Sequence, residues 1–86
     1  MSRHLGLDGF ERLKSDEDKI SQNFTTLFRT PTGEAILKYL RSITIEAVNG
    51  AGVSNDALRH LEGQRYLVGL IERRIVHGEK VRSNGK

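Results

Sequence analysis

The sequence predicts an all-α fold, in which three helices form one compact domain and both chain ends are flexible. Apolar residues recur at helical spacing in three stretches. The first two stretches meet at a Thr-Pro corner, Thr30-Pro31, and the glycine-containing segment 49–52 separates the second from the third. A chain of 86 residues has room for one domain with a small core. We therefore expect a flexible arm over residues 1–9, a three-helix domain over residues 10–78 and a basic flexible tail over residues 79–86.

The first helix is predicted over about residues 16–29. Its apolar residues fall at helical spacing on one side, and they are Phe10, Leu13, Ile20, Phe24, Leu27 and Phe28. The helical spacing itself begins at Phe10, ahead of this range. In the other interpretation, Ser15 or Asp16 is the N-cap and the segment before it forms a separate short turn. The aromatic pair Phe24 and Phe28 is expected on the inner side of the corner.

The second helix is predicted to begin at Pro31 and to run to about Ala47. Thr30 is a favourable N-cap, and proline suits the first helical position because its missing N–H has no partner there. A buried stripe is expected at i, i+4, i+7 and i+11, formed by Ile36, Leu40, Ile43 and Ala47. The segment 42–45 is rich in β-branched residues, so a short strand there is the alternative.

The third helix is predicted to begin near a cap at Ser54, Asn55 or Asp56 and to end at about His77, where Gly78 stops it. Its apolar stripe is formed by Leu61, Val68, Ile71 and Ile75. The tail after Gly78 lacks apolar periodicity, so we expect it to be disordered when the chain is alone.

Glu62, Gly63 and Arg65 form a polar cluster inside the third helix. Glu62 and Arg65 are spaced to pair along one edge, and such an exposed pair contributes little to stability. A glycine inside a helix costs about 1 kcal/mol relative to alanine. We therefore prefer a second interpretation, in which Gly63 lets the corner at Thr30–Gly33 come close and Glu62 or Arg65 satisfies backbone groups there.

The formal charge of +3 is concentrated at the end of the chain, because residues 1–71 carry equal numbers of basic and acidic residues. The simplest interpretation is a solvated helix end whose cations complement the helix dipole. The alternative is weak, non-specific contact with phosphate, as in a small DNA-associated accessory protein. The candidate phosphate contacts are Arg73, Arg74, Lys80, Arg82 and Lys86.

Catalytic chemistry has no visible carrier in this sequence, and we expect no enzyme activity, no cofactor and no metal. His4, His60 and His77 match no zinc spacing, and the consecutive acidic residues 16–18 point in different directions on a helix. The sequence has no cysteine, which excludes disulfides and thiolate metal sites. Because no apolar run reaches about 18–20 residues and no signal-peptide core is present, we expect a protein that is soluble and intracellular when made.

Two motifs make the chain resemble a family of small tailed-phage structural domains, the Bbp-type phage domain. An aromatic pair precedes Thr-Pro-x-Gly and an apolar helix, and a later Glu-Gly-x-Arg opens a final apolar helix. The resemblance covers residues 24–75. The residues at the matching positions, which we expect to shape a partner surface, are Phe24, Phe28, Thr30, Pro31, Gly33, Glu62, Gly63 and Arg65.

The resemblance implies a helical, non-enzymatic protein encoded among the virion-assembly genes of tailed phages, prophages or gene-transfer particles. Its expected partners are other virion or head–tail assembly proteins, or further copies of the same chain. No membrane contact is implied. The expected location is the host cytoplasm during assembly, or the virion itself. The segment 45–53 is shorter and richer in glycine than the family pattern.

Overall fold

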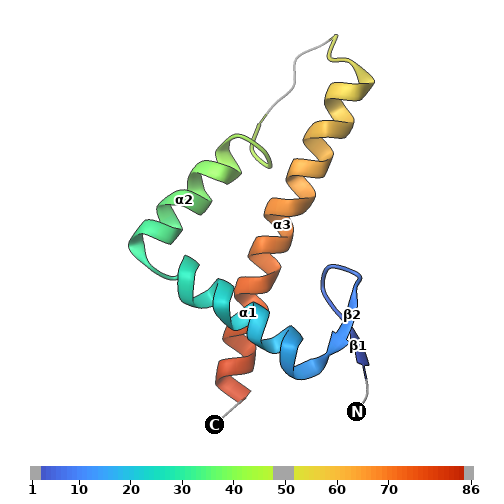
Figure 1. Ribbon diagram of the computed structural model, residues 1–86. Coiled ribbons are helices and arrows are strands. Elements are labelled where there is room, and N and C mark those ends of the chain that lie inside the picture. The colour runs from blue at the N-terminus through green and yellow to red at the C-terminus, as the bar shows by residue number, and fades with distance from the viewer. Residues whose placement is uncertain (1–2, 48–51, 85–86) are drawn as a thin grey trace.

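The structure, a computed structural model, describes residues 3–47 and 52–84. It contains a small hairpin and three helices (Figure 1). In chain order the elements are β1 (Arg3–Leu5), β2 (Glu11–Leu13), α1 (Lys14–Phe28), α2 (Pro31–Ser42) and α3 (Asn55–Asn84). The three predicted helices are therefore confirmed, but the fold is not strictly all-α. In the described ranges, no helix has an apolar stretch long enough to cross a membrane.

The hairpin lies where the sequence predicts a flexible arm and the start of a helical pattern. β1 and β2 pair antiparallel, with His4 opposite Arg12. Gly9 takes the left-handed conformation that the turn requires, at φ 87°, and the Asp8 carboxylate accepts a hydrogen bond from the Phe10 N–H group. Because these contacts are specific to the turn, the apolar spacing around Phe10 did not reveal the hairpin.

Thr30 joins the end of α1 to the start of α2. Its hydroxyl donates to the Leu27 carbonyl oxygen at 2.9 Å and accepts from the Gly33 N–H group at 2.9 Å. Pro31 occupies the first turn of α2, where no N–H group is needed. A Cβ atom on Gly33 would overlap the Leu27 carbonyl oxygen and lie 2.7 Å from the Phe28 Cα atom. Only glycine therefore allows the first turn of α2 to pack this closely against the last turn of α1.

α2 ends at Ser42, five residues before the predicted end at Ala47, and the predicted alternative of a strand over residues 42–45 is also wrong. Successive turns follow instead. The Arg41 carbonyl oxygen accepts the N–H groups of both Thr44 and Glu46. The β-branched residues at 43–45 have restricted side chains in a helix, which favours its early end. Most of the predicted breaking segment 49–52 lies outside the described residues.

Ser54 caps the start of α3, because its hydroxyl accepts a hydrogen bond from the Ala57 N–H group at 3.1 Å. The helix then runs through Gly78 to Asn84, so the predicted stop at Gly78 is wrong, and residues 79–84 are helical where a disordered tail is predicted. Contacts with α1 explain the extension. Glu79 accepts from Arg29 at 2.8 Å, and the Arg82 guanidinium donates to the Thr26 hydroxyl.

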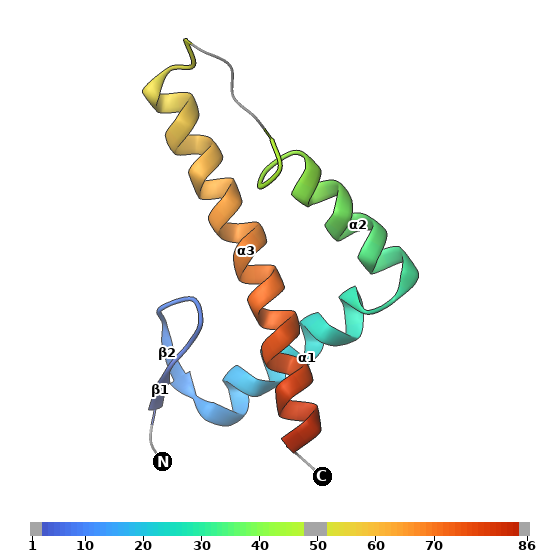
Figure 2. The ribbon, with the colours of Figure 1, turned by 180° about the vertical axis from the view of Figure 1, so that it is seen from behind.

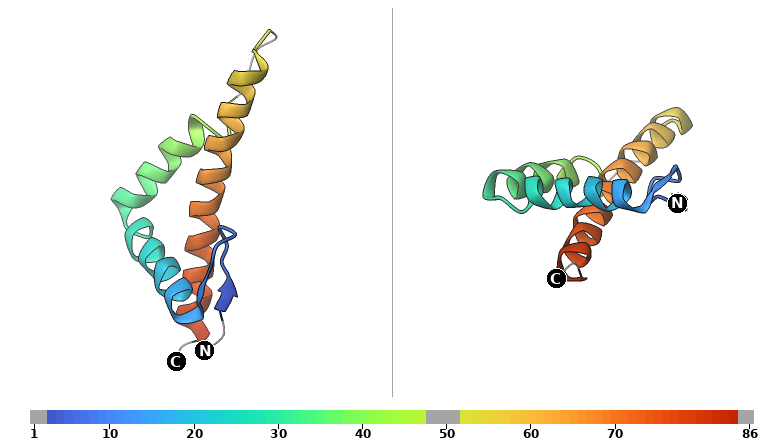
Figure 3. Two further views of the ribbon diagram at one scale, coloured as in Figure 1. Left: turned by 45° about the vertical axis from the view of Figure 1, so that its right-hand side comes forward. Right: turned by 60° about the horizontal axis from the view of Figure 1, so that its bottom comes forward.

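The molecule is flat and extended rather than compact. Its Cα extents are 51 × 32 × 14 Å and its radius of gyration is 15.5 Å, against about 12 Å for a typical globular chain of this length. α1 crosses the C-terminal half of α3, while α2 and the hairpin lie on opposite sides of α3 (Figures 1 and 2). The first turns of α3 project beyond the end of α2, as further views show (Figure 3).

The apolar core is small. Among the described residues, three large apolar side chains are buried, namely Phe28, Val68 and Ile75. Val68 and Ile75 confirm the predicted stripe of the third helix. The predicted buried stripe of the second helix is wrong, because Ile36 is 50% exposed and Ile43 is 48% exposed. The inward side of α2 instead carries Gly33, which is buried, and Thr44 is buried in the turns after the helix.

Candidate functional site

The crossing of α1 and α3 is built from small and polar residues. A Cβ atom on Gly78 would overlap the Thr25 hydroxyl and the Ser21 carbonyl oxygen, so glycine sets how closely the two helices approach. The Thr25 hydroxyl donates to the Ile75 carbonyl oxygen at 2.8 Å. Thr25 and Ser21 are both buried. The crossing is therefore fixed by shape and hydrogen bonds as much as by apolar packing.

A buried ion-pair network continues from this crossing to the hairpin. Glu17, 6% exposed, accepts hydrogen bonds from Arg74 at 2.6 Å, from Arg12 at 2.5 Å and from the Leu7 N–H group at 2.9 Å. Asp8 accepts from Arg12 at 2.9 Å and lies 3.5 Å from Arg74. Among the described residues, every buried side-chain nitrogen or oxygen atom has a hydrogen-bond partner. The network thus ties β2, α1 and α3 together around Glu17.

The network also sets the pKa values of its carboxyl groups. Hydrogen bonds from Arg12 and from the Phe10 backbone lower the pKa of Asp8 to about 2. Burial alone would raise the pKa of Glu17, but hydrogen bonds from Arg74, the Leu7 backbone and Arg12 outweigh it, so this pKa lies below its ordinary value. Both groups therefore remain ionised at neutral pH.

Ser21, His77 and Asp18 lie in an order that suggests a nucleophile, a base and an orienting acid. The Ser21 hydroxyl is 2.6 Å from His77 Nδ1, and His77 Nε2 is 3.6 Å from the Asp18 carboxylate. A nucleophile must reach its substrate, whereas Ser21 is completely buried and also accepts a hydrogen bond from Arg74 at 3.0 Å. The three residues therefore form part of the helix crossing. In the described ranges, no three His, Asp or Glu residues gather as metal ligands would.

The predicted residues of the corner lie together. The rings of Phe24 and Phe28 are stacked, with their centroids 6.0 Å apart, and Phe28 is buried. They pack at the end of α1, which Thr30 joins to Gly33 in α2. These contacts lie where the chain passes from α1 to α2.

Gly63 does not contact this corner. No described atom lies within 4 Å of a Cβ atom built on Gly63, so the predicted close approach is wrong. The close approaches occur at Gly33 and Gly78 instead. Glu62 and Arg65 pair at 3.0 Å, as their spacing predicts. Arg65 also donates to two backbone carbonyl oxygens after α2, those of Thr44 at 2.9 Å and Ala47 at 2.8 Å. Its role is to hold the end of α2 against α3.

The candidate phosphate contacts differ in how accessible they are. Arg74 is 2% exposed and belongs to the ion-pair network, so it is not available to an external phosphate. Arg82 bonds to α1, and Arg73 lies over the ring of Tyr66, 5.7 Å from its centroid. Lys80 is exposed, and Lys86 lies outside the described residues. Three of the five candidate phosphate contacts therefore make contacts within the chain, namely Arg73, Arg74 and Arg82. The sequence did not reveal these contacts.

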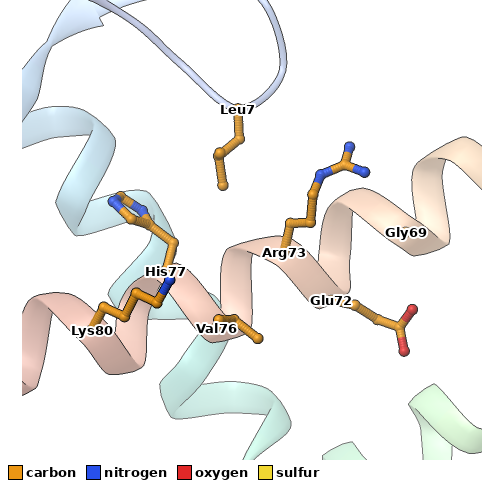
Figure 4. Close-up of a pocket in the computed structure, with 7 residues that line it drawn as sticks. All are labelled: Leu7, Gly69, Glu72, Arg73, Val76, His77 and Lys80. Atoms are coloured by element: carbon orange, nitrogen blue, oxygen red, sulfur yellow. The ribbon is translucent and has the colours of Figure 1, made fainter.

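Apolar side chains left at the surface are the most distinctive feature of the chain. Along α2 and its C-cap, an exposed row at i, i+3 and i+7, which we call the outer stripe, is formed by Ile36, Tyr39 and Ile43. An open groove of about 510 Å³ lies beside it, lined by Pro31, Thr32, Ala35, Ile36 and Tyr39. A second groove, of about 560 Å³, lies along α3 beneath Leu7 of the hairpin (Figure 4). The sequence showed the apolar spacing of α2 but not that Ile36 and Tyr39 stay exposed.

The family comparison places this surface in context. The model of the Bbp19-like phage protein family matches residues 24–83, which is more than two thirds of the chain. This segment contains the corner, α2, most of α3 and the outer stripe. No curated protein and no solved structure matches the chain. The match confirms the resemblance read from the two sequence motifs, and the chain belongs to the family of Bbp19-like phage proteins.

Proposed function

We propose that this phage protein is a non-enzymatic structural or assembly component that acts through contacts with other proteins during virion or head–tail assembly. The observation that carries the proposal is the outer stripe of α2. Tyr39 is 61% exposed, with Ile36 and Ile43 beside it. Contiguous apolar surface of this kind is typical of protein interaction sites.

The outer stripe suits a protein partner because it is apolar and rigid. Ile36, Tyr39 and Ile43 carry no charge, and the neighbouring groove is lined by Pro31 and Ala35. Covering the exposed halves of these three side chains would contribute roughly 3 kcal/mol, at about 1 kcal/mol each. Because α2 is capped at Thr30 and held by Arg65 at its other end, the stripe is presented with little freedom to lose on binding.

The geometry gives less support to an enzyme or to a DNA-associated protein. An enzyme needs a nucleophile or base that substrate can reach, and the Ser21–His77 pair lies inside a helix crossing. A DNA-associated protein would use the basic C-terminal segment, but Arg74 is buried and Arg82 bonds to α1.

The test is recovery of the protein in particles from a phage-producing host. A tagged chain would be expressed in place of the natural copy, and particles would be purified on a density gradient. We expect the chain either in the particles or in assembly intermediates. A double variant of the stripe, Ile36→Ala with Tyr39→Ala, is expected to reduce that recovery at least ten-fold.

Lys38→Ala is the matched control, since Lys38 is exposed on α2 outside the stripe. This variant should be recovered like the unchanged chain. Circular dichroism of each purified variant checks that the helices remain. Equal recovery of the folded stripe variant, or absence of the unchanged chain from every particle and intermediate, would overturn the proposal.

A further inference from the structure

The groove along α3 beneath Leu7, which we call the Leu7 groove, combines an apolar centre with basic edges (Figure 4). Leu7 of the hairpin lies above it and Val76 lies below, and these residues are 37% and 47% exposed. Arg73 and Lys80 extend from α3 on either side of Val76. The volume of about 560 Å³ therefore lies between two apolar side chains and two cations.

The two cations have no acidic partner within α3. A carboxylate stabilises a cation on the same helix from a position three or four residues away. Around Arg73 and Lys80 these positions hold glycine, leucine, valine, histidine, serine and asparagine. The contact of Arg73 with the ring of Tyr66 is a cation–π contact, which provides no carboxylate oxygen for its N–H groups.

The acidic groups beside the groove are paired with other bases. Glu72, at the edge of the groove, lies 2.5 Å from Arg41 of α2. Asp8, next to Leu7 in the hairpin, lies 2.9 Å from Arg12. The two cations of the groove therefore have no ion pair within the part of the chain that the structure describes, and the groove has an uncompensated positive charge.

Leu7 is held above the groove by the ion-pair network. Its N–H group donates to the buried carboxylate of Glu17 at 2.9 Å. A Cβ atom on Gly6 would overlap the Arg12 guanidinium and lie 2.5 Å from Glu17 Oε1, so the hairpin packs directly on the network. A ligand would therefore meet a preformed groove, and little conformational freedom would be lost on binding.

We infer that the Leu7 groove binds an acidic segment of a partner protein. The segment places one apolar side chain between Leu7 and Val76, and it places a carboxylate on each side, against Arg73 and Lys80. These two basic residues are seven positions apart, which corresponds to about 10 Å along the helix. A partner helix with two acidic residues seven positions apart and a leucine between them has the same spacing.

The apolar centre favours such a segment over nucleic acid or free phosphate. Phosphate groups would pair with Arg73 and Lys80 but would leave Leu7 and Val76 uncovered, whereas a leucine would cover both. The Leu7 groove is formed by α3 and the hairpin, and the outer stripe lies along α2. The inference therefore adds a second contact surface to the proposed function and does not depend on the first.

Fluorescence anisotropy with a labelled helix-forming peptide of about 15 residues tests the chemistry of the groove. The peptide carries two glutamates seven positions apart and a leucine four positions after the first. We expect saturable binding to the full chain at low salt. Changing both glutamates to glutamine, or the leucine to serine, should weaken binding about ten-fold. No saturation up to about 1 mM peptide, or equal binding of the three peptides, would overturn the inference.

Charge variants test whether the peptide binds in the groove. Arg73→Glu and Lys80→Glu should each weaken binding of the acidic peptide about ten-fold, and the double variant should bind a peptide with lysines in place of the two glutamates. Arg59→Glu is the matched control, because Arg59 is exposed on α3 and does not line the groove. An equal loss with Arg59→Glu, or no rescue by the lysine peptide, would reject the groove as the site.

Leu7→Ala tests the apolar centre, because it removes the side chain and keeps the backbone hydrogen bond to Glu17. It should weaken peptide binding roughly five-fold. Leu5→Ala is the matched control in the same hairpin, since Leu5 is 73% exposed and does not line the groove. Circular dichroism checks that each variant is folded. Unchanged binding by the folded Leu7→Ala variant would contradict the inference.

Competition distinguishes the other possible occupants. Unlabelled acidic peptide should displace the labelled one at a lower concentration than inorganic phosphate or duplex DNA does. Displacement by either of these at the lower concentration would indicate a phosphate site and overturn the inference. So would self-association of the chain that Arg73→Glu abolishes, since it would show a second copy in the groove. The outer-stripe variant, Ile36→Ala with Tyr39→Ala, should bind the peptide normally, so the inference and the proposed function can fail separately.

Discussion

Two alanine substitutions in α3 are expected to change stability in opposite directions. At Gly63 a methyl group would meet no described atom within 4 Å, so Gly63→Ala should gain about 1 kcal/mol of helix propensity. At Gly78 the methyl group would overlap the Ser21 carbonyl oxygen, which belongs to the backbone of α1 and cannot rotate away. Overpacking costs about 1–3 kcal/mol, and because the overlapping atom belongs to the backbone we take the upper part of that range, about 2–3 kcal/mol. After the propensity gain is subtracted, we expect Gly78→Ala to lose roughly 1–2 kcal/mol.

The assay is thermal unfolding followed by circular dichroism, with all variants at one protein concentration so that self-association does not bias the comparison. For a domain of this size, 1 kcal/mol corresponds to a shift of about 4–8 °C. Gly63→Ala should therefore raise the melting temperature by roughly 4–8 °C, and Gly78→Ala should lower it by roughly 5–15 °C. If Gly78→Ala melted at or above the temperature of the unchanged chain, the close crossing of α1 and α3 would be refuted.

Three further predictions concern the charged groups. Arg74→Ala should lower the free energy of unfolding in urea by about 3 kcal/mol, because it leaves Glu17 buried with fewer partners. Arg73→Ala is the control at an exposed neighbour, and it should lose about 1 kcal/mol or less. Acid titration should show stability falling from about pH 5 towards pH 2, since the lowered pKa values of Asp8 and Glu17 mean that the unfolded chain binds protons first; constant stability to pH 2 would contradict this. In fluorescence anisotropy, any binding to duplex DNA should be weak and disappear by about 0.2 M salt, and tight binding there would favour the DNA-associated alternative.

Local signals predicted the parts of the fold that depend on neighbouring residues. Thr30 and Pro31 mark the start of α2 because capping and the missing N–H act within one turn. Gly78 shows the limit of such signals. A glycine that ends a helix and a glycine that admits another helix look the same in sequence. Only the position of Ser21, 57 residues earlier, distinguishes them.

The candidate site was less predictable because its contacts are long-range. Glu17 lies in an acidic turn that suggests solvent exposure, and Arg74 lies in a basic segment that suggests phosphate. Neither pattern reveals that the two side chains meet at 2.6 Å inside the molecule. The apolar periodicity of α2 was correct as a helix signal. It could not show that Ile36 and Ile43 face outward, because periodicity does not identify what covers a face.

Photo-cross-linking during particle assembly tests most directly whether the outer stripe of α2 is a contact surface for proteins. A photoreactive phenylalanine analogue would replace Tyr39 in a phage-producing host, with the same analogue at Lys38 as the control. The account predicts an adduct between position 39 and another phage-encoded protein, with much less at position 38. No protein adduct at position 39 in cells that produce particles, or equal adducts at both positions, would contradict it.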